Sequence, residues 1–191
     1  MLTGLDEKVL IERAIRGDAN AFGELYSQHL DAIYRYIFFR TGDQQEAEDL
    51  TENVFLKAWE ALPGYKDYGN PFSSWLYRIA HNVVVDHHRR IKPVLGNSDI
   101  DLLESHQDTK ADTLGLVLEA EQVEELGKAI IQLTLEQQQV IILRFIEGLS
   151  HAEISAIIGK NEGTCRMIQH RGLSTLQKLL NGKNWNSDNE K

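Results

Sequence analysis

Apolar residues recur at three- and four-residue intervals along almost the whole chain, the spacing of one face of an α-helix. No stretch alternates apolar and polar side chains between hairpin turns, so the pattern gives no indication of β-strands. The widest apolar stripe falls in residues 19–40 and contains Phe22, Leu25, Tyr26, Leu30, Ile33, Ile37 and Phe38. The pattern therefore predicts an all-α chain.

The first half of the chain is predicted to form four helices. Residues 6–16 form the first, which ends at Gly17, and residues 19–40 form the second. The third begins after Asp43, which forms a capping box with Glu46, and ends before Pro63. Two glycines and two prolines break the chain in residues 63–71, and the fourth helix follows in residues 73–92.

The second half is also predicted to be helical, in residues 113–131, 135–146, 151–158 and 161–180. Two of these helices begin at capping boxes, Thr134 with Gln137 and Ser150 with Glu153. Gly159 is expected to end the helix that Ser150 begins. Residues 93–111 are polar and show little periodicity, which is typical of a linker.

Composition limits the class of protein. The chain has 191 residues, 42% of them hydrophobic, which is enough for one medium domain or two small ones. No apolar run approaches the roughly 20 residues of a membrane helix, and the N-terminus carries charges where a signal peptide is apolar. A cytoplasmic protein is expected. Cys165 is the only cysteine, so neither an internal disulfide nor a cysteine-based metal site can form.

The net charge of −9 argues, as an average, against nucleic-acid binding. The charge is unevenly distributed, however. Residues 97–125 carry 1 basic and 9 acidic side chains, whereas residues 1–96 carry 11 and 14, and residues 126–191 carry 8 and 6. This asymmetry indicates two nearly balanced modules joined by an acidic connector.

Residues 150–180 predict a helix-turn-helix, with a capped helix, a turn at residues 159–161 and a longer second helix. Small side chains at Ala152 and Ala156 are expected to let the two helices cross closely. Residues 160–183 carry five basic side chains and one acidic, a local positive excess. Because the second helix of such a motif enters the major groove, DNA binding is favoured over a plain helical hairpin.

Residues 72–90 place aromatic and polar groups along one helix face, namely Trp75, Arg78, His81 or Asn82, Asp86 and Arg89. Rings interleaved with such polar groups suit single-stranded nucleic acid, whose bases stack on them. Leu76, Ile79 and Val83 already supply an apolar stripe. Of Trp75 and Tyr77, one is therefore expected at the surface and the other in the core.

A rival interpretation concerns Asp86-His87-His88, which resembles the Asp-His-His signature of metal-dependent phosphoesterases. That chemistry requires further ligands on the strand ends of an α/β sheet, and the sequence predicts no sheet. A polar helix C-terminus, with the two histidines beside Arg89 and Arg90, is the favoured interpretation.

Residues 47–59 form a mixed acidic and apolar helix face. Asp49, Glu52 and Asn53 are predicted to project together, beside Leu56 in the next turn. Such a face suits docking on a basic partner helix, and solvated charges on a core helix explain the pattern equally well.

In this order, the segments AEDLTENVFLKAWE, FSSWLYRIAHNVVVDHHRR and EISAIIGKNEGTCRMIQHR resemble the extracytoplasmic-function group of the sigma-70 family of bacterial transcription initiation factors. The resemblance covers residues 18–92, corresponding to sigma region 2, and residues 112–181, corresponding to region 4. It implies two small helical domains, residues 1–92 and 112–181, with an acidic flexible linker at 93–111 and a disordered tail at 182–191.

The resemblance also implies roles for particular residues. Those matching the family's docking surface for the polymerase β′ clamp helices are Asp49, Leu50, Glu52, Asn53 and Phe55. Those matching the element that opens minus-10 DNA and captures a flipped base are Trp75, Arg78, His81, Asn82, Asp86, Arg89 and Arg90. Those matching the helix that reads the minus-35 duplex are Lys160, Asn161, Glu162, Thr164, Arg166, His170 and Arg171.

The implied partners are core RNA polymerase, through its β′ clamp helices and β flap, promoter DNA and an anti-sigma factor. The resemblance implies no enzymatic activity, cofactor, metal or membrane insertion. A stand-alone helix-turn-helix regulator, dimeric on a palindrome, is the alternative from another class. The aromatic segment at residues 72–82 argues against that alternative, because a reader of duplex DNA needs no stacking surface.

The chain departs from the family pattern at two places. Glu52-Asn53 stands where a Gln-Glu pair is usual, which predicts a docking contact shifted by one position. Cys165 and Met167 occupy a recognition helix in which small, β-branched or polar residues are commoner. Cys165 has basic neighbours, as a redox-sensing thiol would, although a lone helical cysteine is usually packed.

Overall fold

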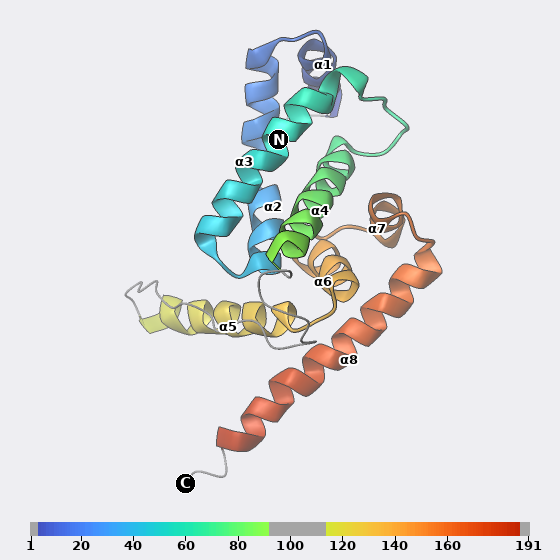
Figure 1. The fold of residues 1–191 in the computed structure, drawn as a ribbon. Helices are drawn as coiled ribbons and strands as arrows, with labels where there is room; N and C mark the ends of the chain where they lie inside the picture. The colour runs from blue at the N-terminus through green and yellow to red at the C-terminus, as the bar shows by residue number, and fades with distance from the viewer. Residues whose placement is uncertain (1–3, 92–113, 188–191) are drawn as a thin grey trace. The chain divides into compact units, whose positions relative to one another are not determined.

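The structure is a computed structural model that describes residues 4–91 and 114–187, and within these ranges every regular element is a helix (Figure 1). The chain forms two compact units, one from residues 1–37 and 45–97 and the other from residues 38–44 and 98–191. The all-α fold in two small helical domains is confirmed. The predicted acidic linker at 93–111 lies outside the described residues. None of the described helices is long and apolar enough to cross a membrane.

The first unit is built around four α-helices. They are α1 (Gly4–Ile15), α2 (Ala19–Thr41), α3 (Gln44–Ala61) and α4 (Phe72–Ile91), with a short 3₁₀ turn, η1 (Leu62–Gly64), after α3. Their apolar stripes face one another, and the fully buried side chains include Leu25, Ile33, Val54, Leu62 and Leu76. The observed helix limits agree with the predicted ones to within two residues.

Ring contacts hold α2 against α3. Phe22 and Trp59 have ring centroids 4.9 Å apart, and those of Tyr26 and Phe55 lie 4.6 Å apart in an edge-on arrangement. Edge-on and tilted contacts at such distances favour aromatic pairs beyond the area that they bury. The two pairs therefore fix how these helices lie against each other.

The turn between α1 and α2 is closed by Gly17 and Asp18. Gly17 adopts a φ of 89°, a conformation that favours glycine, as its predicted role at the helix end requires. Asp18 Oδ1 accepts hydrogen bonds from the amides of Asn20 and Ala21, at 3.0 and 3.2 Å. The Arg13 side chain and these amides hold the pKa of Asp18 below its usual value.

The second unit contains α5 (Leu114–Ile131), α6 (Leu135–Ile141), α7 (His151–Ile158) and α8 (Glu162–Ser187). Thr134 and Gln137 form the predicted capping box at the start of α6. The predicted helix over 135–146 changes character at η3 (Ile142–Ile146), a π-helical turn in which the Glu147 amide donates to the Ile142 carbonyl at 3.0 Å. α8 continues to Ser187, so it includes the first part of the expected tail.

The close helix crossing in this unit lies at Gly172 of α8. A Cβ atom placed there would lie 3.0 Å from Ile141 Cγ1 of α6. Of the two small residues expected to let α7 and α8 cross closely, Ala152 is exposed and Ala156 is half-buried, so Ala152 does not fit that expectation. α7 instead buries Ile154 and Ile157, because these face the rest of the unit.

The start of α7 is fixed by the predicted capping box. Ser150 Oγ accepts from the Glu153 amide at 3.2 Å, and Glu153 Oε2 accepts from the Ser150 amide at 2.7 Å. The Ser150 hydroxyl also donates to Glu153 Oε2 at 2.6 Å. This hydrogen bond, followed by that of the Ser150 amide, holds the pKa of Glu153 below its usual 4.5. Gly159 ends the helix with a φ of 68°.

Gly172→Leu is expected to lower the free energy of unfolding of the second unit by about 1–3 kcal/mol, because the added side chain must displace Ile141. Urea unfolding measures the change. Ser174→Leu places the same side chain at an exposed position of the same helix and should change stability by less than about 0.5 kcal/mol. Equal effects of the two substitutions would contradict the close crossing.

Glu153→Gln is expected to remove a pH-dependent part of the stability. Since folding lowers the pKa of Glu153, its contribution is present above the unfolded-state pKa and is lost as the pH falls through the folded-state value. Wild type should therefore be more stable than Glu153→Gln at neutral pH. The difference in their free energies of unfolding should disappear in acid. Urea titrations across this range test it, with Glu24→Gln on the exposed side of α2 as the control. A stability difference that persists in acid would exclude a pH-dependent contribution of the Glu153 carboxylate.

Candidate nucleic-acid interface

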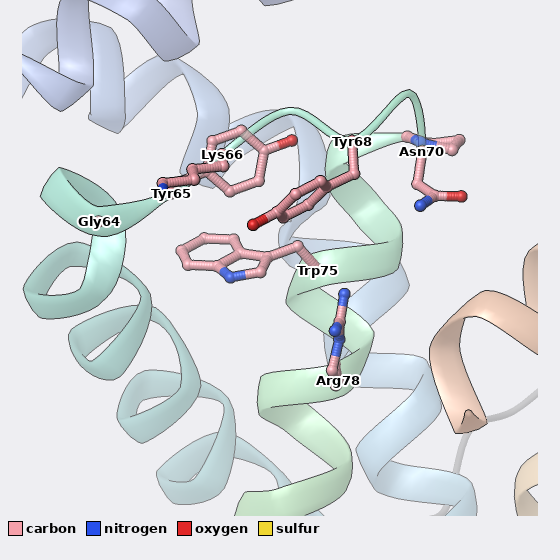
Figure 2. Close-up of a pocket in the computed structure, with 8 residues that line it drawn as sticks. Gly64, Tyr65, Lys66, Tyr68, Asn70, Trp75 and Arg78 are labelled. Atoms are coloured by element: carbon pink, nitrogen blue, oxygen red, sulfur yellow. The ribbon is translucent and has the colours of Figure 1, made fainter.

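A hollow of about 190 Å³ lies where the loop after η1 meets α4. Its lining residues come from both segments and are Gly64, Tyr65, Lys66, Tyr68, Asn70, Pro71, Trp75 and Arg78. Figure 2 shows the rings of Tyr65 and Tyr68 on the loop side and the indole of Trp75 beneath them, with Arg78 one turn further along α4. The hollow thus combines aromatic walls with cations and an amide.

The walls of the hollow rest on Phe72, the buried first residue of α4. Its ring lies 5.4 Å from that of Tyr65 and 5.3 Å from that of Trp75, and Tyr65 and Trp75 are themselves 5.1 Å apart. Trp75 is half-buried and lines the hollow, whereas Tyr77 is buried and meets the ring of Tyr36 at 5.3 Å. The prediction of one surface and one core aromatic residue is confirmed.

The remaining residues predicted for minus-10 DNA follow along α4. Those with exposed side chains are Arg78, Asn82, Asp86, Arg89 and Arg90, and His81 is half-buried. Asp86 and Arg89 form a loose ion pair at 3.8 Å. Polar groups therefore continue from the hollow toward the C-terminal end of α4.

Sequence reasoning missed the loop side of the hollow. Tyr65, Lys66, Tyr68 and Asn70 stand between glycines and prolines that the sequence pattern indicates only as a helix break. The alternation of tyrosine with lysine was the available signal, because aromatic and basic groups together suit nucleic acid. Tyr68 is 78% exposed, which is unusual for an aromatic side chain that serves only the core.

The structure gives the Asp86-His87-His88 segment a structural role. His87 Nε2 lies 3.2 Å from Glu46 Oε2, so this pair links α4 to α3. Among residues 4–91 and 114–187, no cluster of three histidine, cysteine or acidic side chains could hold a metal ion, and none of these residues lies in a sheet. The contact of His87 with Glu46 supports the interpretation as a polar helix C-terminus over the phosphoesterase one.

In the second unit, polar caps shape the turn between α7 and α8. Asn161 Oδ1 accepts from the Thr164 amide at 2.8 Å and from its hydroxyl at 3.1 Å, which caps α8. The Ser155 hydroxyl donates to the Lys160 carbonyl at 2.6 Å, and His151 Nε2 contacts Gln169 Oε1 at 2.7 Å. These bonds fix the angle at which α8 leaves α7.

Cys165 lies inside this helix pair. Its side chain is buried, and burial raises the pKa of the thiol. A raised pKa disfavours the reactive thiolate, so the packed interpretation of Cys165 is supported over the redox-sensing one.

The exposed side of α8 carries most of the residues predicted to read duplex DNA. Asn161, Arg166, His170 and Arg171 are exposed, and Lys160, Glu162 and Thr164 are half-buried. Two of the cations have acidic partners within the unit, Lys160 with Glu136 at 2.9 Å and Arg166 with Glu162 at 2.8 Å. Met167, which was named only as a departure from the family pattern, is 47% exposed on the same side.

The predicted docking residues divide into two groups. Asp49 and Glu52 are exposed and Asn53 is half-buried, whereas Leu50 and Phe55 are buried. Direct docking through those two side chains does not fit their burial, because both support α3 from inside the unit. Leu56, one turn beyond Glu52, is 59% exposed and supplies the apolar part of this surface.

Two family models match the chain. That for sigma-70 region 2 matches residues 25–93, so α1 lies outside it, and that for sigma-70 region 4 matches residues 123–176. The first match contains the hollow, and the second contains α7, the following turn and α8 as far as residue 176.

Relatives support the same assignment. ECF RNA polymerase sigma factor BldN of Streptomyces coelicolor is 39% identical over 171 residues, which are 90% of this chain and 64% of BldN, so this chain spans less than two thirds of that relative. ECF RNA polymerase sigma factor SigD of Mycobacterium tuberculosis is 31% identical over 177 residues, covering 88% of this chain and 81% of SigD.

A solved structure has the same fold. The sigma factor RpoE of Bartonella quintana, in complex with the anti-sigma factor NepR, superposes with a TM-score of 0.66 at 24% identity, covering 84% of this chain and 96% of that chain. Fold, family models and relatives agree, and the chain belongs to the extracytoplasmic-function group of the sigma-70 family of RNA polymerase sigma factors.

Proposed function

We propose that this chain directs bacterial RNA polymerase to specific promoters by capturing a displaced base of the minus-10 element in the hollow of the first unit. The observation that carries the proposal is the hollow itself, whose aromatic walls stand beside Lys66, Asn70 and Arg78. A base outside the duplex needs an aromatic surface for stacking and polar groups at its edge. The hollow offers both in one place (Figure 2).

The row of polar groups along α4 extends this site. Asn82, Asp86 and the cations Arg89 and Arg90 follow the hollow on exposed positions. Arginine side chains bind phosphates through paired hydrogen bonds, and an amide can read a base edge. We assign this row to the single strand that leaves the hollow.

The helix-turn-helix of the second unit is assigned to the minus-35 duplex. Arg166, His170 and Arg171 are exposed on α8. Arginine recognises guanine by paired hydrogen bonds in the major groove, and the exposed Met167 offers an apolar contact to a thymine methyl group. The Arg166 guanidinium pairs with Glu162, one turn earlier on α8.

We assign polymerase docking to the exposed face of α3, with Asp49, Glu52, Asn53 and Leu56. Acidic side chains around an apolar anchor suit the β′ clamp helices, and the second unit is assigned to the β flap. With a net charge of −9, the free chain should bind DNA weakly. Polymerase would hold the two units at a fixed spacing, which raises their joint affinity for a promoter.

We further propose control by an anti-sigma factor, because the fold is that of a sigma factor solved with such a partner. An inhibitor covering the α3 face or the hollow would block polymerase or DNA directly. The proposed place of action is the cytoplasm, where polymerase and promoter DNA meet. In this proposal the chain contributes no catalytic group, since the polymerase performs the chemistry.

Run-off transcription with core polymerase and promoter fragments of the source bacterium tests the DNA assignments. Asn82→Ala and Arg171→Ala should each lower transcript yield about fivefold or more, because each removes a contact to a base. Gln28→Ala on α2 and Lys178→Ala, farther along α8, are the matched exposed controls and should stay within about twofold. Tight promoter binding without polymerase, or failure to bind core polymerase, would refute the proposal.

Leu56→Ala is expected to weaken binding to core polymerase about tenfold, because a central apolar anchor in an interface carries about 1–2 kcal/mol. Titration of labelled chain with core polymerase measures the affinity. Val9→Ala removes a similarly exposed apolar side chain from α1 and should leave the affinity unchanged. Wild-type affinity of the Leu56 variant would place docking elsewhere.

A further inference from the structure

The tip of the loop that forms one side of the hollow is exposed. Tyr68 at this tip is 78% exposed, and Gly69 adopts a φ of 81°. Asp67 Oδ1 accepts from the Gly69 amide at 2.7 Å, which closes a tight turn around Tyr68. This turn sets the direction of the Tyr68 side chain but does not tie the loop to the rest of the unit.

An ion pair with α1 connects the loop to the rest of the unit. Lys8 Nζ lies 3.4 Å from Asp67 Oδ2, the oxygen that the turn leaves available. The amide of Gly69, and then Lys8, keep the pKa of Asp67 below its usual value, so the carboxylate is charged at neutral pH. One carboxylate therefore shapes the tip and anchors it to α1.

The preceding residue of α1 supports the opposite wall. His29 of α2 donates from Nε2 to Glu7 Oε1 at 3.0 Å, and its half-buried ring lies 5.6 Å from that of Phe72. Phe72 in turn holds Tyr65 and Trp75. Burial, followed by the nearby charges of Asp67 and Glu7, raises the pKa of Tyr65.

We propose that α1 is a brace for the base-binding hollow, holding both of its walls. Lys8 positions the Tyr68 wall through Asp67. Glu7 positions the wall of Tyr65 and Trp75 through His29 and Phe72. Lys8 and Glu7 are positioning residues, since neither lines the hollow. The inference rests on the proposed function only where it assigns a base to the hollow. The brace itself is a property of the first unit.

A fluorescence measurement on the free, full-length chain tests the brace without DNA. With Trp59 and Trp185 replaced by phenylalanine, Trp75 is the single tryptophan, and acrylamide quenching reports its accessibility. Lys8→Met should raise the quenching constant, whereas Lys8→Arg should retain the wild-type value because it keeps the ion pair. Arg16→Met removes an exposed cation just beyond the C-terminal end of α1 and serves as the charge-matched control.

The partner residue supplies an internal check. Asp67→Asn keeps an oxygen for the Gly69 amide and loses the charge that pairs with Lys8, so its effect should match that of Lys8→Met. The double variant should be no worse than either single one. Because both side chains are largely exposed, at 69% and 46%, the effect of Lys8→Met should shrink at high salt. Additive effects, or equal quenching in Lys8→Met and Arg16→Met, would overturn the brace.

Promoter opening tests whether the brace serves DNA. On a promoter recovered by run-off transcription, 2-aminopurine placed at successive positions of the opened segment reports the displaced base. Lys8→Met should lower opening about two- to fourfold, with unchanged binding to core polymerase and unchanged melting temperature. If Lys8→Met opens the promoter normally while Tyr68→Ala does not, the claim that Lys8 positions the Tyr68 wall is refuted. Normal promoter opening in both Tyr68→Ala and Trp75→Ala would instead refute the assignment of a base to the hollow. The acrylamide-quenching measurement would still test whether α1 acts as a brace.

Discussion

Burial of the Phe72 ring at the start of α4 is the interaction on which the first unit's site depends. The ring is 2% exposed, and it meets His29 of α2, Tyr65 of the loop and Trp75 of α4. A large aromatic side chain gains more from burial than most residues, and tilted ring contacts restrict its neighbours. The loop and the helix therefore hold their aromatic walls in place before any ligand is present.

The second unit reaches an equally fixed geometry by polar means. Ser150 with Glu153 begins α7, and Asn161 begins α8, so the turn between them is specified by side-chain oxygens that accept backbone amides. Behind this polar edge, Cys165 and the isoleucines of both helices fill the interior. One side of α8 is thus committed to packing, and the other is exposed.

The charge distribution supports the proposal that a third component, the polymerase, holds the two small surfaces together. The acidic excess of residues 97–125 makes the chain as a whole unsuited to bind DNA by itself, although each unit carries cations on the assigned surface. On the second unit two of these cations, Lys160 and Arg166, already have acidic partners within the protein. This balance of acidic and basic side chains favours DNA recognition within a complex over non-specific attraction of the free chain to DNA.

The sequence by itself determined what depends on near neighbours: the helices, both capping boxes of the second unit and the left-handed ends at Gly17 and Gly159. Their hydrogen bonds join residues a few positions apart, so the pattern contains them. Only the tertiary structure decided that Leu50 and Phe55 are core, that Gly172 makes the close crossing, and that the loop after η1 forms a wall of the hollow. These features join segments distant in the sequence, and helical periodicity cannot specify which side chains meet across that distance.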